Sequence, residues 1–351
     1  MNFLNILNQY WQPAVFAFAI TVVLVLLAMK IFPKLGLMDR PEKYGLKRPP
    51  IPYYGGLAIF LAFIVCAVVF VPFNKELAGL IVGAGLIVGV GFFDDMFSLS
   101  PWIRLFVQFT ACVIIVVCGI GILSINIPFL GTLDFSGIIW RGIPIISAIF
   151  TIVWVIVILN TMNLIDGIGG LGSGVSFVAA LTIFILSIHP GVHEDPQSQV
   201  AVATLALIIA MIALAFFIFD FPKPKILMGD SGSTFFGFII AALAIFSGGK
   251  VATAFLVLGI PILDMLWVFL RRIFSGQKFW KGDLKHLHHR LLDLGISARK
   301  VVLMYVFVTA LLGAVAVSFV SGQQKLFVII GLIILMVLLA SALVFVPRRR
   351  D

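Results

Sequence analysis

The chain has 351 residues, of which 62% are hydrophobic and only 11% are charged, and its mean hydropathy is +1.20. Soluble domains are about half apolar, so this composition excludes a soluble protein. The formal net charge is +9, but the sequence has neither a basic stripe with aromatic partners nor a nucleic-acid-binding motif. We therefore expect no nucleic-acid partner.

The sequence contains apolar blocks that are long enough to cross a bilayer as helices. There are eleven, at about residues 13–32, 52–72, 76–93, 101–122, 143–160, 168–188, 198–219, 232–248, 250–271, 301–320 and 325–346. They predict an all-α, polytopic integral membrane protein with about eleven transmembrane helices. The longest stretch between blocks is 272–300, so we expect residues 1–351 to form a single transmembrane domain.

The basic residues predict the orientation of the chain. If the N-terminus lies outside and the spans alternate, only four of the 24 Lys and Arg residues fall outside: Lys75, Arg141, Lys250 and Lys325. Basic loops stay on the cytoplasmic side. We therefore expect a multi-pass protein of the plasma membrane, with its N-terminus outside and its C-terminus inside.

Four polar segments all fall on that cytoplasmic side. In chain order they are GFFDDMFSLSP (91–101), NTMNLIDGIGGLGSG (160–174), FDFPKPKILMGDSGS (219–233) and FWKGDLKHLHHRLLDLG (279–295). The outside loops hold a few acids in no pattern. This asymmetry predicts an active site at the cytoplasmic face.

The first two segments place acids and amides at the ends of spans. Asp94 and Asp95 are either part of a solvated turn or, because acids at a helix C-terminus oppose its dipole, a pair that needs a cation. Asn160, Asn163 and Asp166 recur every three residues and so point to one side of a helical turn. The glycines that follow either allow close helix packing or let a phosphate approach backbone amides.

The third segment contains MGDSGS. It is either a turn in which Ser231 or Ser233 caps the next span, or a site where backbone N–H groups, the Asp230 carboxylate and a positive helix end hold a magnesium-bound phosphate. Further along, Asp264 lies inside a predicted span. An acid there is expensive, which makes it a functional candidate.

The fourth segment is typical of an amphipathic helix, with Asp283 as N-cap and Gly295 at its end. His286, His289 and Arg290 share one face of that helix. No His-Glu-x-x-His pattern or nearby cysteine favours zinc, so phosphate binding fits this basic face better.

In order and spacing, these motifs resemble those of the polyprenyl-phosphate N-acetylhexosamine-1-phosphate transferases. DDMFSLSP resembles the family's Asp-Asp segment, and NTMNLIDGIGGL its Asn-x-x-Asn-x-x-Asp-Gly segment. MGDSGS resembles its Gly-Asp-x-Gly-Ser turn, HLHHRL its histidine motif and PIPYYGGLAI (50–59) its first inside loop. The resemblance covers about residues 39–295 and is closest to the branch that transfers N-acetylglucosamine 1-phosphate (GlcNAc-1-phosphate).

The resemblance implies an enzyme that joins a sugar 1-phosphate from a UDP-N-acetylhexosamine to a polyprenyl (undecaprenyl) phosphate, giving a lipid-linked diphosphosugar and UMP. This would be the first membrane step of cell-envelope polysaccharide synthesis. It implies Mg²⁺, which Mn²⁺ can replace, held by Asn163 and Asp230. The implied catalytic residues are Asp94, Asp95, Asp166, Asp230 and His289. The implied substrate-binding residues are Lys47, Asn160, Asn163, His286, His288 and Arg290.

Two other functions and one assembly stay open. The related phospho-N-acetylmuramoyl-pentapeptide transferases of peptidoglycan synthesis usually have ten spans and a His-His-His motif. A membrane transporter is the second alternative, although the chain shows no internal repeat and its acids gather at helix ends rather than at the midplane. A homodimer is one assembly to be tested.

Three features depart from the family pattern. Gly169 stands where the branch usually has an acid that contacts uracil, and Asp220 stands where asparagine is usual. The basic first loop, RPEKYGLKRPP (40–50), lacks the histidine often found there. If Gly169 only omits an acceptor, Gly169→Asp should improve the choice of uracil. If the glycine instead relaxes a tight turn, the added carboxylate should repel the diphosphate and slow turnover. The two hypotheses predict opposite signs.

Overall fold

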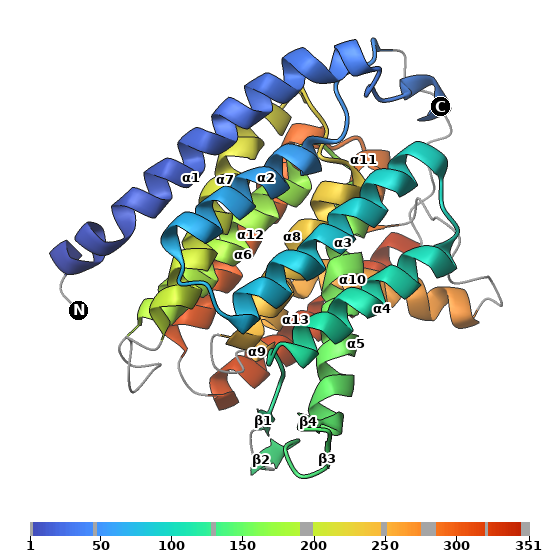
Figure 1. Ribbon diagram of the computed structural model, residues 1–351. Coiled ribbons are helices and arrows are strands. Elements are labelled where there is room, and N and C mark those ends of the chain that lie inside the picture. The colour runs from blue at the N-terminus through green and yellow to red at the C-terminus, as the bar shows by residue number, and fades with distance from the viewer. Residues whose placement is uncertain are drawn as a thin grey trace.

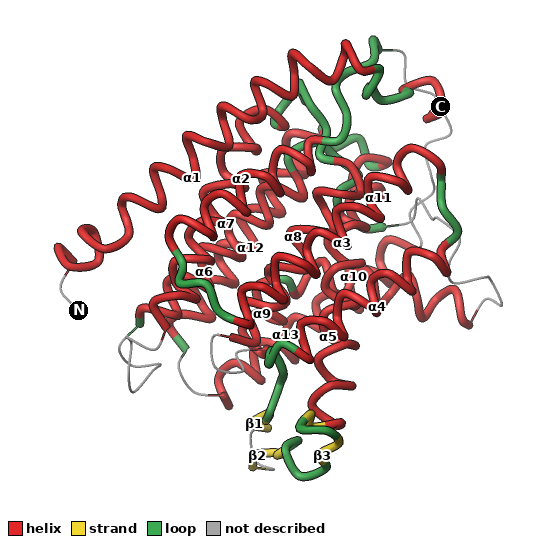
Figure 2. The backbone as a smooth tube through the Cα atoms, viewed as in Figure 1, coloured by secondary structure: helices red, strands yellow, loops and turns green. Residues whose placement is uncertain are grey.

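The protein is a bundle of helices that run mostly side by side (Figures 1 and 2). The computed structural model describes residues 3–44, 48–127, 131–189, 199–246, 251–274, 286–319 and 322–344. Seven helices are long and apolar enough to cross a membrane. They are α1 (Phe3–Ile31), α3 (Lys75–Phe97), α5 (Ile145–Ile165), α6 (Leu171–Ile188), α7 (Val200–Asp220), α8 (Gly229–Phe246) and α12 (Ala298–Ser318).

The remaining helices are shorter or less apolar. Three of them contain shorter apolar stretches, namely α2 (Gly55–Phe70), α4 (Pro101–Val117) and α13 (Gly322–Val344). The others are α9 (Val251–Val257), α10 (Gly259–Phe274), α11 (Leu287–Asp293) and the 3₁₀ turns η1 (Phe32–Leu35) and η2 (Pro41–Tyr44). The helical, multi-pass architecture is thus confirmed, whereas the count of eleven spans and the sides of the termini stay predictions.

One predicted span is interrupted. The apolar block 250–271 is divided between α9 and α10, which meet at Leu258. Pro261 lies just inside α10 and has no backbone N–H to donate to the carbonyl four residues earlier, which weakens the helix at that point. The block therefore forms two helices rather than one.

Two β-hairpins at one end of the bundle depart from the all-α prediction (Figure 1). Strand β1 (Ser124–Ile127) pairs with β2 (Gly131–Asp134), and β3 (Ile139–Trp140) pairs with β4 (Ile143–Pro144). Arg141 and Gly142 join the second pair with φ of 49° and 81°. Positive φ at both central residues is the requirement of a type I′ hairpin turn.

Helix α8 lies at the centre of the bundle, packed against α2, α3 and α5. Every residue of α8 except Asp230 and Phe246 is buried. Glycines allow its first turn to approach two neighbours closely. A Cβ added at Gly56 of α2 would lie 2.3 Å from the Gly232 nitrogen, and one at Gly91 of α3 would lie 2.5 Å from the Ser231 Cα. The close packing presents only the Asp230 end of α8 to the site.

The segment before α8 is also fixed by backbone hydrogen bonds. Leu227 N donates to Pro52 O at 3.0 Å, and Gly55 N donates to Leu227 O at 2.8 Å. The loop that precedes α2 and the MGDSGS segment therefore form one unit, although they lie far apart in the sequence.

Candidate active site

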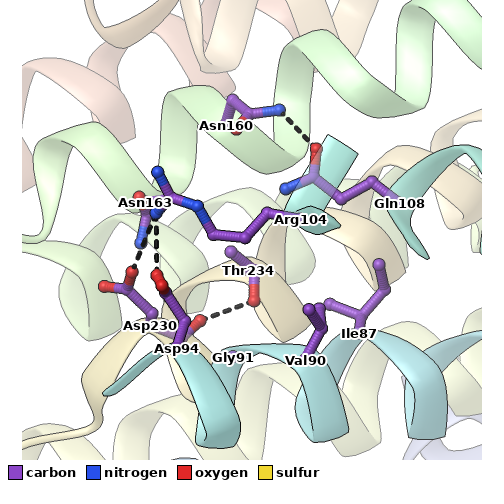
Figure 3. Close-up of a pocket in the computed structure, with 10 residues that line it drawn as sticks. All are labelled: Ile87, Val90, Gly91, Asp94, Arg104, Gln108, Asn160, Asn163, Asp230 and Thr234. Atoms are coloured by element: carbon purple, nitrogen blue, oxygen red, sulfur yellow. Dashed lines mark hydrogen bonds and ion pairs between the residues drawn. The ribbon is translucent and has the colours of Figure 1, made fainter. Parts of the chain in front are cut away.

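Two carboxylates from different helices meet one arginine. Asp94 lies near the C-terminus of α3, Asp230 at the N-terminus of α8 and Arg104 in α4 (Figure 3). Arg104 Nη1 lies 2.8 Å from Asp94 Oδ2 and 3.6 Å from Asp230 Oδ2. The sequence prediction that Asp94 and Asp230 share one site agrees with this geometry, and Arg104 supplies a cation that the motif analysis did not single out.

Asp95 is directed to the backbone at the start of α8. Its Oδ1 accepts hydrogen bonds from Tyr53 OH at 3.1 Å and from Asp230 N at 3.2 Å. Its Oδ2 is buried and, among the residues described, has no hydrogen-bond partner. A Cβ added at Gly229, whose φ is 70°, would lie 2.5 Å from that oxygen. The glycine is required there by both its backbone conformation and this carboxylate.

The amides predicted on α5 line the same pocket. Asn163 Nδ2 donates to Ser233 Oγ at 3.1 Å and lies beside the Asp230 carboxylate (Figure 3). One turn earlier, Asn160 Nδ2 donates to Gln108 Oε1 at 3.0 Å. The narrow pocket is lined by Ile87, Val90, Gly91, Asp94, Arg104, Gln108, Asn160, Asn163, Asp230 and Thr234.

A second, wider pocket of about 450 Å³ begins at the same carboxylates. It shares Asp94, Arg104 and Asp230 with the narrow pocket and extends to Tyr53, Tyr54 and the segment 35–40. That segment is held by Asp39, whose carboxylate accepts hydrogen bonds from the Arg48 guanidinium and from Ile51 N. Small polar groups can thus reach the carboxylates through the narrow pocket, and larger ligands through the wide one.

Asp166 lies at the C-terminus of α5. It belongs to a second cluster of side chains, next to the cluster of Asp94, Asp230 and Arg104. A Cβ at Gly172 would lie 2.5 Å from its Oδ1, so a side chain at that position would displace the carboxylate. Burial, followed by the charges of Asp220 and Asp230, raises the pKa of Asp166 well above its ordinary value. Burial and the neighbouring acids thus disfavour the charged form of Asp166, and a cation bound nearby would favour it.

The histidine segment contacts the loop that follows Asp166. The rings of His288 and His289 are 4.2 Å apart, and a Cβ at Gly167 would lie 2.8 Å from His288 Nε2. His288 is buried, and within the described ranges neither of its ring nitrogens has a hydrogen-bond partner. Burial, with smaller contributions from His289 and His286, lowers the pKa of His288 to about 3, so the ring is neutral.

The predicted boundary of the histidine helix was wrong. Helix α11 begins at Leu287 with His286 as its N-cap, not at Asp283, which lies outside the described residues. The cap is supplied from another helix, because Asp264 Oδ1 accepts the hydrogen bond of Leu287 N at 2.9 Å. Lys47, a predicted substrate-binding residue, also lies outside the described residues.

Asp220 and Gly169 are explained by packing. Asp220 Oδ2 accepts hydrogen bonds from Gly170 N at 2.8 Å and Ser173 Oγ at 3.0 Å, and thereby holds the start of α6. A Cβ at Gly169 would lie 2.3 Å from Pro224 Cγ and 2.9 Å from Asp220 O. The loop has no room for a side chain at residue 169 in this arrangement.

Three site residues were missed by the motif analysis: Arg104, Gln108 and Tyr53. A signal for two of them was present, since Arg104 and Gln108 lie four residues apart and therefore on one face of α4. Helix α4, which carries this face, directly follows the Asp-Asp segment in the chain. Tyr53 lies in the PIPYYGGLAI segment, but nothing in that segment indicated its role, because its partner Asp95 is 42 residues away.

The chain is similar in sequence to known proteins over most of its length. Residues 77–248 match the model of glycosyl transferase family 4. The chain is 30% identical over 340 residues to a probable undecaprenyl-phosphate N-acetylglucosaminyl 1-phosphate transferase of Bacillus subtilis, covering 93% of this chain and 91% of that protein. It is 29% identical over 335 residues to a decaprenyl-phosphate N-acetylglucosaminephosphotransferase of Mycobacterium tuberculosis, covering 86% and 80%. It is 29% identical over 329 residues to an undecaprenyl-phosphate alpha-N-acetylglucosaminyl 1-phosphate transferase of Yersinia pestis, covering 90% and 84%.

Proposed function

The chain belongs to glycosyl transferase family 4, and from this premise we propose that it transfers GlcNAc-1-phosphate from UDP-GlcNAc to a polyprenyl phosphate, releasing UMP. The observation that carries the proposal is the meeting of Asp94, Asp230 and Arg104 at the ends of three helices, beside a buried amide-lined pocket. The named activities of the relatives supply the sugar phosphate and the polyprenyl phosphate.

The chemistry calls for charge stabilisation more than for a base. A phosphate monoester has its second pKa near 6, so the lipid phosphate is mostly a dianion at neutral pH and already a nucleophile. Two phosphate-bearing substrates repel each other, and phosphoryl transfer depends mainly on positioning and on stabilising charge. The attacking lipid oxygen forms a bond to the β-phosphorus of the UDP-sugar, and UMP leaves with the electrons of the broken bond.

The residues present fit a magnesium ion. Asp230 and Asn163 provide a carboxylate and an amide oxygen, and the buried Oδ2 of Asp95 has no hydrogen-bond partner in the described part of the chain. Within the described ranges, no three His, Cys, Asp or Glu side chains are grouped to hold a metal by themselves. Mg²⁺ usually uses one or two carboxylates and completes its shell with water and substrate phosphates. When bound, Mg²⁺ or Mn²⁺ would neutralise charge on the diphosphate.

The protein's own groups divide into two sides. On the lipid-phosphate side, Arg104 offers its guanidinium, and Asp94 orients Arg104 through their 2.8 Å contact. Asp95 holds the first turn of α8 through Asp230 N. On the nucleotide-sugar side we place Asn160, Asp166, His286, His288, His289 and Arg290, with Lys47 from the loop before α2.

The location follows from the same proposal. Lipid phosphate and soluble nucleotide must meet at a membrane surface, and the basic loops favour the cytoplasmic face of the plasma membrane. We also propose that the chain crosses the membrane eleven times with its N-terminus outside, and that it forms a homodimer. The relatives are named for N-acetylglucosamine, which favours this sugar over muramoyl-pentapeptide, and no observation favours transport.

The test is UMP release from UDP-GlcNAc by purified protein, dependent on added polyprenyl phosphate. We expect turnover to stop in EDTA, to return with Mg²⁺ or Mn²⁺, and to fall at least about 100-fold in Asp230→Asn, which is about 2.7 kcal/mol of barrier. Trp154→Phe is a control, because it removes a buried hydrogen bond to Ala241 O at 3.1 Å outside the site. Full turnover in EDTA would refute the metal, and no UMP release from the wild type would refute the function.

A further inference from the structure

A buried carboxylate on α10 lies outside the proposed machinery. The Asp264 side chain is 4% exposed. Its Oδ2 lies 3.1 Å from His286 Nδ1, and its Oδ1 accepts the hydrogen bond of Leu287 N at 2.9 Å. Both oxygens are therefore used at one place, the beginning of α11, which is 22 residues later in the chain.

These two contacts account for the burial of the acid. A carboxylate away from water is strongly unfavourable unless charge-assisted hydrogen bonds compensate it. An ionised carboxylate only accepts hydrogen bonds. His286 Nδ1 therefore carries the hydrogen and donates a hydrogen bond to Asp264. The contact fixes which ring nitrogen of His286 faces away from α10, namely Nε2.

A chain of contacts connects Asp264 to the proposed nucleotide-sugar side. The rings of His286 and His288 are stacked, with centroids 5.8 Å apart and planes at 8°. His288 lies against Gly167, the residue after Asp166. The stacked rings thus form a path along which we expect a shift of His286 to reach His288 and then the loop between α5 and α6.

We infer that Asp264 is a positioning residue, which holds His286 in one tautomer and sets the histidine segment against Gly167. The inference rests on the proposed function, since it assigns Asp264 an effect on binding of the nucleotide sugar. It makes Asp264 neither a metal ligand nor a group that touches the reacting atoms. The expected signature is a raised KM for UDP-GlcNAc, with kcat and the KM for the lipid nearly unchanged.

Asp264→Asn separates this role from a general need for a buried polar group. Asparagine keeps an acceptor oxygen for Leu287 N, but its amide nitrogen only donates, so it would pair with the other tautomer of His286, which carries its proton on Nε2. Asp220→Asn is a matched control. Asp220 is also buried, but both of its donors share one oxygen, Oδ2, so asparagine loses neither hydrogen bond.

The experiment measures KM and kcat for both substrates, with the thermal midpoint of each variant. We expect Asp264→Asn to raise the KM for UDP-GlcNAc about tenfold and Asp220→Asn to change it less than twofold. Asp264→Glu, which keeps two acceptor oxygens, should recover most of the loss. A wild-type KM in Asp264→Asn would overturn the inference. If the wild type itself released no UMP, the proposed function would fail instead.

A double-mutant cycle tests whether Asp264 acts through His286. In a His286→Gln background, Asp264→Asn should raise the KM further by less than twofold, because its partner is already lost. Independent, multiplying effects would show that Asp264 does not act through His286 and would overturn the inference. If Asp264→Asn does not fold, the same cycle is run with Asp264→Ser, which also removes the carboxylate, and the same coupling is expected.

Discussion

Gly169 can be judged at the scale of single atoms. An added Cβ would lie 2.3 Å from Pro224 Cγ and 3.2 Å from Asp220 Oδ1, so an aspartate would meet both a rigid ring and another carboxylate. Of the two hypotheses drawn from the sequence, the packing favours the tight turn. We expect Gly169→Asp to lower UMP release at least about tenfold, with UDP-GlcNAc and TDP-GlcNAc alike, since overpacking usually costs about 1–3 kcal/mol.

The matched control is Gly137→Asp, because nothing lies within 4 Å of a Cβ at Gly137. That variant should retain wild-type turnover. A Gly169→Asp enzyme that prefers uracil more strongly than the wild type would instead support the missing-acceptor hypothesis.

His288 predicts how stability changes with pH. Its pKa of about 3 lies below the ordinary value of 6.5. Between these two pH values the unfolded chain binds a proton at this residue and the folded chain does not. The stability is complete above pH 6.5 and falls as the pH drops towards 3, by up to about 1.4 kcal/mol per pH unit. We expect the thermal midpoint of the wild type to decrease as the pH is lowered from 7 to 5. In His288→Phe the decrease should be smaller. Equal slopes in the two proteins would contradict this assignment.

The sequence predicted individual site residues only where they lie in a short, recognisable motif. Asp94, Asp230 and Asn163 meet as the three motifs suggested. Arg104 and the partnership of Asp264 with His286 were not predictable, because each depends on how helices pack rather than on neighbours in the chain. The direction of the Asp264 carboxylate, towards α11, is decided by tertiary structure alone.

At the scale of elements, small residues hold α8 between its neighbours. A Cβ at Gly56 would lie 2.3 Å from the Gly232 nitrogen, which is backbone and cannot rotate away. We expect Gly56→Ala to destabilise the protein by about 1–3 kcal/mol and to lower turnover, because it displaces the turn that carries Asp230. The measurements are the thermal midpoint and UMP release. Gly89→Ala in α3, where nothing lies within 4 Å, should leave both nearly unchanged.

The apolar pattern predicted where helices occur better than where they begin and end. Long apolar runs leave backbone groups to be satisfied within the segment, and this requirement favours a helix in each block. The hairpins of residues 124–144 escaped prediction because each strand is only two to four residues long. The start of α11 was misplaced because its cap comes from α10.

At the scale of the whole molecule, the distribution of charge predicts the orientation. Cysteines introduced at Ser98, an exposed residue after α3, and at Lys285, which lies outside the described residues, should react with an impermeant thiol reagent only from the inside. A cysteine at Thr132 in the exposed β2 strand should react only from outside. The unmodified chain is the control for background labelling, since Cys66 and Cys112 are buried but Cys118 is only partly buried. Reaction of Ser98→Cys in intact cells would refute the orientation.

The burial of α8 also governs how its backbone exchanges hydrogen with solvent. An amide exchanges only when its hydrogen bond opens and water reaches it, and in a core helix this requires an opening close to global unfolding. Because only Asp230 and Phe246 of α8 are not buried, we expect the amides between them to exchange slowly. The carboxylate of Asp230 thus stands at the start of a helix whose backbone we expect to open only rarely.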